Sequence, residues 1–371
     1  MKVAIIGGGV IGLSTAWELS SRGHEVTLID KGRFGRKASW AGAGILLPGN
    51  AETAIHPLEH LEAASNDLHE TWSQRLMDLT SIDNGYRKCG GIYVAMTDGE
   101  IATLSGSILY WQERNIEAEK LSRESFASQY PLLSNLTTME KFLSAALPGE
   151  AQICNPWHVQ ALVAACEKNS VQLLPNHIVS NYAASSSKLE SITVDDRSQN
   201  FDAYVFACGA WTQQVTSDLV DCVQMVPVRG QMILYRLETP LDLPIINEGT
   251  RYIVPRDDGH VLVGATIEEA GFDESTTDAA IEKLSSDAQR IVPALTKDKI
   301  NKTWAGLRPG THDGFPYMGR LPGLGNAFVS TGHFKTGLQL SSGSAVAMAD
   351  LIVGKETLVD LTPFDPSRVL L

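Results

Sequence analysis

The sequence has little cysteine, and its cysteines form no recognisable pattern. The five residues are odd in number and no two of them have the C-x-x-C spacing: Cys89, Cys154, Cys166, Cys208 and Cys222. A disulfide framework and a zinc site are therefore not expected, and a reducing compartment fits this composition. The nine histidines include no H-E-x-x-H motif, and we predict no metal site.

Positive charge and long apolar runs are also scarce. Lys and Arg number 30 against 43 Asp and Glu, so the formal net charge is −13. This excludes a broad nucleic-acid surface but allows a local basic pocket for a small anion. No apolar run reaches the length of a membrane span, and glycines interrupt the apolar residues 3–13, which argues against a secretion signal. We expect a cytoplasmic protein.

What the chain does contain is enough apolar sequence for two structural units. It has 371 residues, of which 43% are hydrophobic, and no Pro/Gly-rich linker separates it into two contiguous halves. Two units would thus require the chain to pass between them more than once. Periodicity predicts strands at 3–6, 26–29, 86–96, 223–237 and 252–265, and helices at 10–22, 56–82, 98–115, 156–169, 276–292 and 336–353.

A glycine-rich motif joins the first predicted strand to the first predicted helix. Residues 7–12, GGGVIG, match G-x-G-x-x-G in the strand–turn–helix context that a dinucleotide site requires. Gly7 permits a tight turn, Gly9 lets the backbone approach a pyrophosphate, and Gly12 lets the helix pack against the strand. The exposed N–H groups at the helix start then favour negative charge.

An acidic residue completes this nucleotide signature. Asp30 ends the second predicted strand, eighteen positions after Gly12, where its carboxylate can accept hydrogen bonds from both ribose hydroxyls. The same carboxylate would repel a 2′-phosphate, which disfavours NADP. The motif alone does not decide between NAD and FAD.

The segments that follow carry a family resemblance. RFGRKASWAGAGIL (33–46), LPGEAQICNP (147–156), ACGAWT (207–212), VPVRGQ (226–231), YIVPRDDG (252–259), VGATIEEAGFD (263–273), WAGLRPGTHDGFPYMG (304–319) and STGHFKTG (330–337) stand in the order known from one family. The chain resembles the FAD-dependent D-amino-acid oxidase family over nearly its whole length. It is most similar to the bacterial glycine oxidase branch of thiamine biosynthesis.

This resemblance implies a composite α/β (α+β) fold. A Rossmann-like, doubly wound FAD-binding domain would comprise residues 1–85, 146–220 and 300–371. A substrate-binding domain with a mostly antiparallel sheet would comprise residues 86–145 and 221–299 and roof the flavin. That interrupted division agrees with the absence of a linker. Relatives assemble as oligomers, and we expect a homo-oligomer.

The resemblance also assigns contacts with FAD to matching positions. Val10 and Ile11 would line the pyrophosphate, and Asp30 with Lys31 the adenosine. The remaining contacts would come from Ala38, Ser39, Ala43, Gly44, Ile45, Ile178, Gly209, His333, Phe334, Lys335, Thr336, Gly337 and Leu338. Family members with a cysteine-linked flavin carry Cys where this chain has Gly306, so we predict non-covalent FAD.

Three residues are candidates for the substrate site. Arg308 can bind a carboxylate with a bidentate pair of hydrogen bonds, and Tyr252 can add a third bond from a neighbouring strand. Glycine oxidases often carry Arg where this chain has Lys335, a point charge that either steers an anion or remains solvated. An Arg before Pro309 and a strand Tyr also serve purely structural roles in many proteins.

These residues predict oxidation of glycine or another small amino acid, such as sarcosine or a small D-amino acid. Hydride transfer to flavin would give an imine and then a 2-oxo acid, ammonia and, with molecular oxygen, hydrogen peroxide. Three alternatives stay open: a D-amino-acid dehydrogenase that reduces a quinone, a nicotinamide-dependent dehydrogenase, and a flavin-bound protein without turnover. A related fold also serves as a module of a tRNA-modifying enzyme. The acidic net charge argues against that role here, because binding RNA phosphates needs a basic surface.

Overall fold

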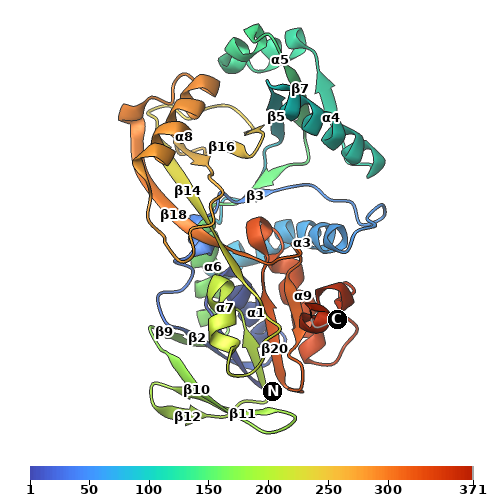
Figure 1. The fold of residues 1–371 in the computed structure, drawn as a ribbon, viewed down its shortest axis with the longest axis vertical. Coiled ribbons are helices and arrows are strands. Elements are labelled where there is room, and N and C mark those ends of the chain that lie inside the picture. The colour runs from blue at the N-terminus through green and yellow to red at the C-terminus, as the bar shows by residue number, and fades with distance from the viewer. Residues whose placement is uncertain (370–371) are drawn as a thin grey trace.

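The computed structural model describes residues 1–369 and contains a six-stranded and an eight-stranded sheet (Figure 1). The first is built around the apolar strand that opens the chain, and it is parallel except at one edge. Its spatial order is β19 (Tyr317–Arg320), β20 (Ala327–Thr331), β13 (Ala203–Phe206), β1 (Lys2–Ile6), β2 (Glu25–Asp30) and β9 (Gln172–Pro175). Its central strands are short continuous apolar runs because both faces are covered.

Helices cover one face of this sheet. Val3 and Ile5 of β1 share a buried core with Trp17, Leu61 and Met348 of these helices. The four helices are α1 (Val10–Ser21), α3 (Pro57–Thr80), α6 (Asn155–Lys168) and α9 (Ser341–Ile352).

The opposite face lies against a small antiparallel sheet. Ala4 and Ile6 of β1 share a core with Leu189 and Ile192. This sheet consists of β10 (Val179–Ala184), β11 (Leu189–Val194) and β12 (Arg197–Gln199). The predicted Rossmann-like arrangement is therefore confirmed, with a three-stranded sheet and the short helix α7 (Thr212–Thr216) on its second face.

The eight-stranded sheet lies across the molecule from the first and is antiparallel except for one pair, β15 with β5. Its order is β18 (Ile300–Gly310), β14 (Val226–Arg236), β17 (His260–Gly264), β16 (Arg251–Pro255), β15 (Ile245–Glu248), β5 (Gly91–Ala95), β7 (Leu143–Leu147) and β6 (Glu119–Leu121). Because β18 pairs along its length with β14, we propose that the domain boundary predicted at residue 300 be drawn after Gly310.

Alternate residues of this second sheet face two environments. Ile246, Ile253 and Val263 pack against α8 (Asp278–Ile291) and its neighbours, whereas Met232, Ile245 and Val254 share a core with Ala43 on the other face. The helix α4 (Asp98–Glu113) covers β5 and β7 on that second side. The other elements are α2 (Ala38–Ala41), α5 (Arg123–Gln129), η1 (Pro131–Thr138), η2 (Gly209–Trp211), η3 (Lys297–Lys299), η4 (Phe334–Thr336), η5 (Thr362–Phe364), η6 (Pro366–Val369) and a small sheet of β3 (Ile45–Leu46), β8 (Ala151–Gln152) and β4 (Arg87–Lys88).

The predicted last helix is wrong at its start. Periodicity places its first residue at Thr336, but α9 begins at Ser341. Residues 334–336 form a 3₁₀ turn in which Phe334 has a φ of +46°, and regular helix follows only after a further turn. The chain therefore turns past the cavity described below before the helix begins. No helix within residues 1–369 is both long enough and apolar enough to span a bilayer.

Candidate active site

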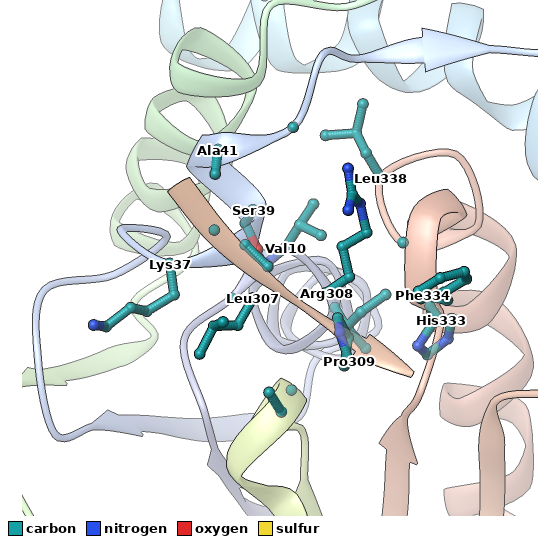
Figure 2. Close-up of a pocket in the computed structure, with 18 of the residues that line it drawn as sticks. Val10, Lys37, Ser39, Ala41, Leu307, Arg308, Pro309, His333, Phe334 and Leu338 are labelled. Atoms are coloured by element: carbon teal, nitrogen blue, oxygen red, sulfur yellow. The ribbon is translucent and has the colours of Figure 1, made fainter. Parts of the chain in front are cut away.

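A cavity of about 630 Å³ lies between the glycine loop and the eight-stranded sheet (Figure 2). Much of its wall comes from the loop after β1, the segment around α2, strands β14, β16 and β18, and residues 330–339; the end of β2 and residues 177–179 and 207–211 also line it. The two sheets thus contribute opposite walls of one site.

The glycine loop has the geometry that the motif predicts. Gly7 has a φ of +109°, and a Cβ at this position would lie 2.4 Å from the carbonyl oxygen of Ala207. A Cβ at Gly12 would lie 1.9 Å from the carbonyl oxygen of Gly7, so α1 approaches the loop too closely for a side chain. Gly9 lines the cavity.

Asp30 anchors this loop as well as lining the cavity. Its Oδ2 accepts a hydrogen bond from the Gly8 amide at 2.7 Å, and its Oδ1 accepts one from the Gly32 amide at 2.7 Å. Each carboxylate oxygen retains a lone pair, so the group can still accept bonds from ribose hydroxyls.

The segment around α2 is held against the glycine loop and against β8. The Val10 amide, at the start of α1, donates to Ser39 Oγ at 2.8 Å. Gly44 has a φ of +75°, and a Cβ there would lie 1.9 Å from the carbonyl oxygen of Ile153. These contacts fix the backbone of Ala43 and its neighbours along one side of the cavity.

Arg256 supports the same segment from the eight-stranded sheet. Its guanidinium donates to the Ala43 carbonyl at 2.7 Å, the Ile153 carbonyl at 3.0 Å and Gln152 Oε1 at 2.6 Å. Burial lowers the pKa of Arg256, and its Nε has no partner among the described residues. The YIVPRDDG segment carries the family resemblance, but nothing in it indicates that this arginine turns inward.

Arg308 projects from β18 into the cavity (Figure 2). Its Nη1 donates to the Thr266 carbonyl at 3.0 Å, and a Cβ at Gly230 would lie 2.4 Å from the guanidinium. Within residues 1–369 no carboxylate forms an ion pair with Arg308. The glycine therefore makes room for a cation whose charge is left for a ligand.

Tyr252 lies beside this guanidinium. Burial raises the pKa of Tyr252, and the neighbouring Arg308 opposes that rise, so the phenol stays protonated at neutral pH. Its hydroxyl is 3.3 Å from Met232 Sδ, which is a weak acceptor, and the hydrogen is free to turn to a better one.

The loop 333–338 supplies the wall next to Arg308. Lys335 is exposed at the border of the cavity, with its Nζ 5.3 Å from the centre of the Phe334 ring. Partial burial and the charge of Arg308 lower the pKa of Lys335. His333 is buried, its Nε2 pairs with Ser344 Oγ at 3.0 Å, and burial lowers its pKa to about 3, so the imidazole is neutral.

The structure brings the predicted residues together around this one cavity. All of the named cofactor and substrate positions line it except Gly12, which packs behind the loop. Sequence analysis missed lining residues whose segments carry no motif, including Leu47, Tyr93, Asn247, Gly249 and Thr250. At Gly306, a Cβ would lie 2.5 Å from that of Ala41, so a flavin-linking cysteine would not fit there.

The chain matches the profile of the FAD-dependent oxidoreductase family over residues 2–351. It belongs to this family. It is 33% identical to a glycine oxidase of Pseudomonas aeruginosa, over 99% of this chain and 98% of that protein, and 32% identical to one of Pseudomonas putida, over 98% of each. The crystal structure of a glycine oxidase from Geobacillus kaustophilus superposes with a TM-score of 0.90 at 30% identity, covering 99% of this chain and 98% of that one.

The cavity fits FAD, the cofactor of this family. The glycine loop and Asp30 suit the pyrophosphate and the ribose, because the loop opens the N-terminus of α1 and the carboxylate keeps lone pairs as acceptors. His333 Nδ1 and Ser330 Oγ are buried polar atoms without a partner among the described residues, and both residues line the cavity. When bound, FAD supplies the hydride acceptor.

Proposed function

We propose that the protein catalyses the FAD-dependent oxidative deamination of glycine or another small amino acid. The observation that carries this proposal is the Arg308 guanidinium, which enters the cavity without a carboxylate partner among the described residues. The glycine oxidases among its relatives support the same substrate class. The products would be a 2-oxo acid, ammonia and, with molecular oxygen as the electron acceptor, hydrogen peroxide.

Arg308 and Tyr252 would hold the substrate carboxylate. Two parallel N–H bonds from a guanidinium fix both the position and the plane of a carboxylate, and the Tyr252 hydroxyl adds a third donor. This anchorage fixes the neighbouring α-carbon, and such orientation supplies a large part of the rate of a bimolecular step. The apolar residues Leu307 and Leu338 exclude water beside the anchor.

Anaerobic mixing of the purified protein with glycine tests the proposal. We expect bleaching of the oxidised flavin band, because the substrate delivers its hydride in the absence of oxygen. Glycolate, which has the carboxylate but no amine, should bind without bleaching. A flavin band that stays oxidised with glycine, sarcosine and D-alanine would refute the proposed activity.

Lys335 has a smaller expected effect than the anchor. It is exposed, so its charge attracts an anionic substrate mainly through solvent. We expect Lys335→Met to raise the KM for glycine about two- to fivefold at low salt, with kcat unchanged and the difference smaller at high ionic strength. A steady-state titration at two salt concentrations measures this. A large loss of kcat would instead place Lys335 at the reacting atoms.

We also propose that the protein acts in thiamine biosynthesis and that it is a cytoplasmic homo-oligomer, both on the strength of the family resemblance.

The competing proposal for the electron acceptor is a quinone, as in a D-amino-acid dehydrogenase. The yield of peroxide per glycine consumed in air separates the two, since an oxidase forms one peroxide per turnover.

A further inference from the structure

A buried acid lies behind the cavity wall, on the side of Tyr252 away from Arg308. Glu150, in the turn between β7 and β8, is fully buried. It accepts a hydrogen bond from the Tyr93 hydroxyl at 2.9 Å and one from Asn247 Nδ2 at 3.2 Å. A Cβ at Gly91 would lie 1.9 Å from Glu150 Oε2, so a glycine in the adjoining strand makes room for the carboxyl group.

This carboxyl group has no cationic partner within residues 1–369. Burial raises the pKa of Glu150 to about 7, and the hydrogen bonds from Tyr93 and Asn247 oppose that rise. Buried carboxylates are costly unless a cation balances them. A positive group placed in the adjoining cavity would stabilise the ionised form of Glu150.

Tyr93 and Asn247 connect this acid to the cavity. Asn247 pairs in register with Tyr252 on one side and with Tyr93 on the other, so the three side chains share one face of β16, β15 and β5. All three line the cavity. Asn247 and Tyr93 form the part of this wall beyond Tyr252. With neighbouring strands about 4.8 Å apart, Asn247 lies one strand from Tyr252 and Tyr93 two strands, or about 10 Å, from it. Arg308 lies on β18, on the other side of β17 and β14.

The hydrogen bonds to Glu150 determine which atoms the wall offers to a ligand. The Tyr93 hydroxyl has a single hydrogen, and it is donated to the carboxylate. Asn247 directs its Nδ2 to the same group. The Tyr93 Oη lone pairs and Asn247 Oδ1 therefore remain as acceptors. The cavity has a cation at one end and a wall of acceptors, backed by a carboxylate, at the other.

We propose that Glu150, through Tyr93 and Asn247, makes the site select amino acids that carry a second ammonium group at the end of a short side chain. This inference rests on the proposed function, because the carboxylate anchor at Arg308 orients such a substrate. Its α-carboxylate binds at Arg308 and its distal ammonium lies against the acceptor wall. The distal cation takes no part in the oxidation; it adds binding energy.

A matched substrate series tests the inference on the holoenzyme. D-2,4-diaminobutyrate, D-norvaline and D-glutamate carry side chains of similar length that end in an ammonium, a methyl and a carboxylate group. We expect kcat/KM for the diamino acid to exceed that for D-norvaline at least tenfold, because hydrogen bonds to a charged group are worth about 1.5–3 kcal/mol. D-glutamate should be the poorest of the three.

Variants separate the acid from the rest of the wall. Glu150→Gln removes the negative charge and should bring the ratio of diaminobutyrate to norvaline close to one, mainly through KM. Tyr93→Phe removes the connecting hydroxyl and should lower the ratio in part. This variant tests the inference if Glu150→Gln does not bind flavin. The matched control is Glu248→Gln, a similarly buried acid next to Asn247 whose side chain pairs with Arg251 and Arg290. It should lower the melting temperature but keep the ratio.

The outcomes distinguish this inference from the proposed function. The inference alone is overturned if the protein oxidises glycine but does not prefer D-2,4-diaminobutyrate to D-norvaline. It is also overturned if the protein shows that preference but Glu150→Gln leaves it unchanged. A flavin that neither glycine nor any member of the series reduces overturns both.

Discussion

Replacing Arg308 by methionine is expected to raise the KM for glycine by about two to three orders of magnitude. Methionine keeps much of the apolar stem but removes the charge and both donors. Truncating one partner of a buried, hydrogen-bonded charge pair costs about 2–5 kcal/mol, or about 1.5 to 3.7 orders of magnitude, and this range includes the expected change. Because Gly230 leaves space for the guanidinium and no internal carboxylate within residues 1–369 loses a partner, the fold and the flavin should be retained. Steady-state kinetics and the flavin content measure both.

Two further variants test whether the rise in KM is caused by the loss of the carboxylate anchor at Arg308. Arg308→Lys keeps the positive charge but lacks the planar pair of N–H donors, and it should recover only part of the affinity. Arg236→Met changes an exposed arginine on the neighbouring strand β14, away from the cavity wall, and should leave the KM unchanged. Glycolate that binds Arg308→Met as tightly as it binds the wild type would contradict the assignment of the anchor.

The parts of the site that the sequence predicted are those whose chemistry is local. The turn at Gly7, the close packing at Gly12 and the carboxylate of Asp30 follow from a motif within thirty residues, because one strand and one helix suffice to place them. The family resemblance placed Arg308 and Tyr252 in the same way, since each lies in a segment with a recognisable pattern.

The parts that were missed depend on pairings between distant segments. Tyr93 becomes part of the wall only because β5 pairs in parallel with β15, which lies about 150 positions later in the chain. Glu150 and Arg256 are charged residues in turns or at strand ends, positions where such residues are usually solvated. Glu150 is buried because a glycine leaves room for it, and Arg256 turns inward because backbone carbonyls accept its hydrogen bonds. Periodicity carries no signal for either.

The first residue of the last helix was predicted wrongly for a related reason. The residues at 337–345 have helical spacing, but residues 334–339 also line the cavity that Arg308 enters. The chain satisfies this with Phe334 at positive φ and a 3₁₀ turn. The wall at this edge of the cavity therefore belongs to a loop, and the regular helix begins five residues later than the sequence predicts.

The glycine at position 12 should be a highly sensitive backbone position of the cofactor site. Gly12→Ala adds a Cβ that would lie 1.9 Å from the Gly7 carbonyl oxygen, and both atoms lie at the glycine-rich turn. The contact cannot be relieved by a side-chain rotation, so α1 and the loop must separate. We expect the variant to be purified with less than about a tenth of the wild-type flavin and to unfold with about 2 kcal/mol less stability or worse.

A second helical glycine provides the matched control. Gly106 lies on the exposed side of α4, and apart from its chain neighbours and the helix backbone no atom of residues 1–369 lies within 4 Å of the position that a Cβ would take there. Since alanine has the higher helix propensity, Gly106→Ala should stabilise the protein by about 0.5–1 kcal/mol and leave the flavin content unchanged. Flavin absorbance per polypeptide and urea unfolding of both variants measure the contrast. If Gly12→Ala retains a full complement of flavin, then the close approach of α1 to the loop is not what shapes the pyrophosphate site, and the loop amides alone would have to account for binding.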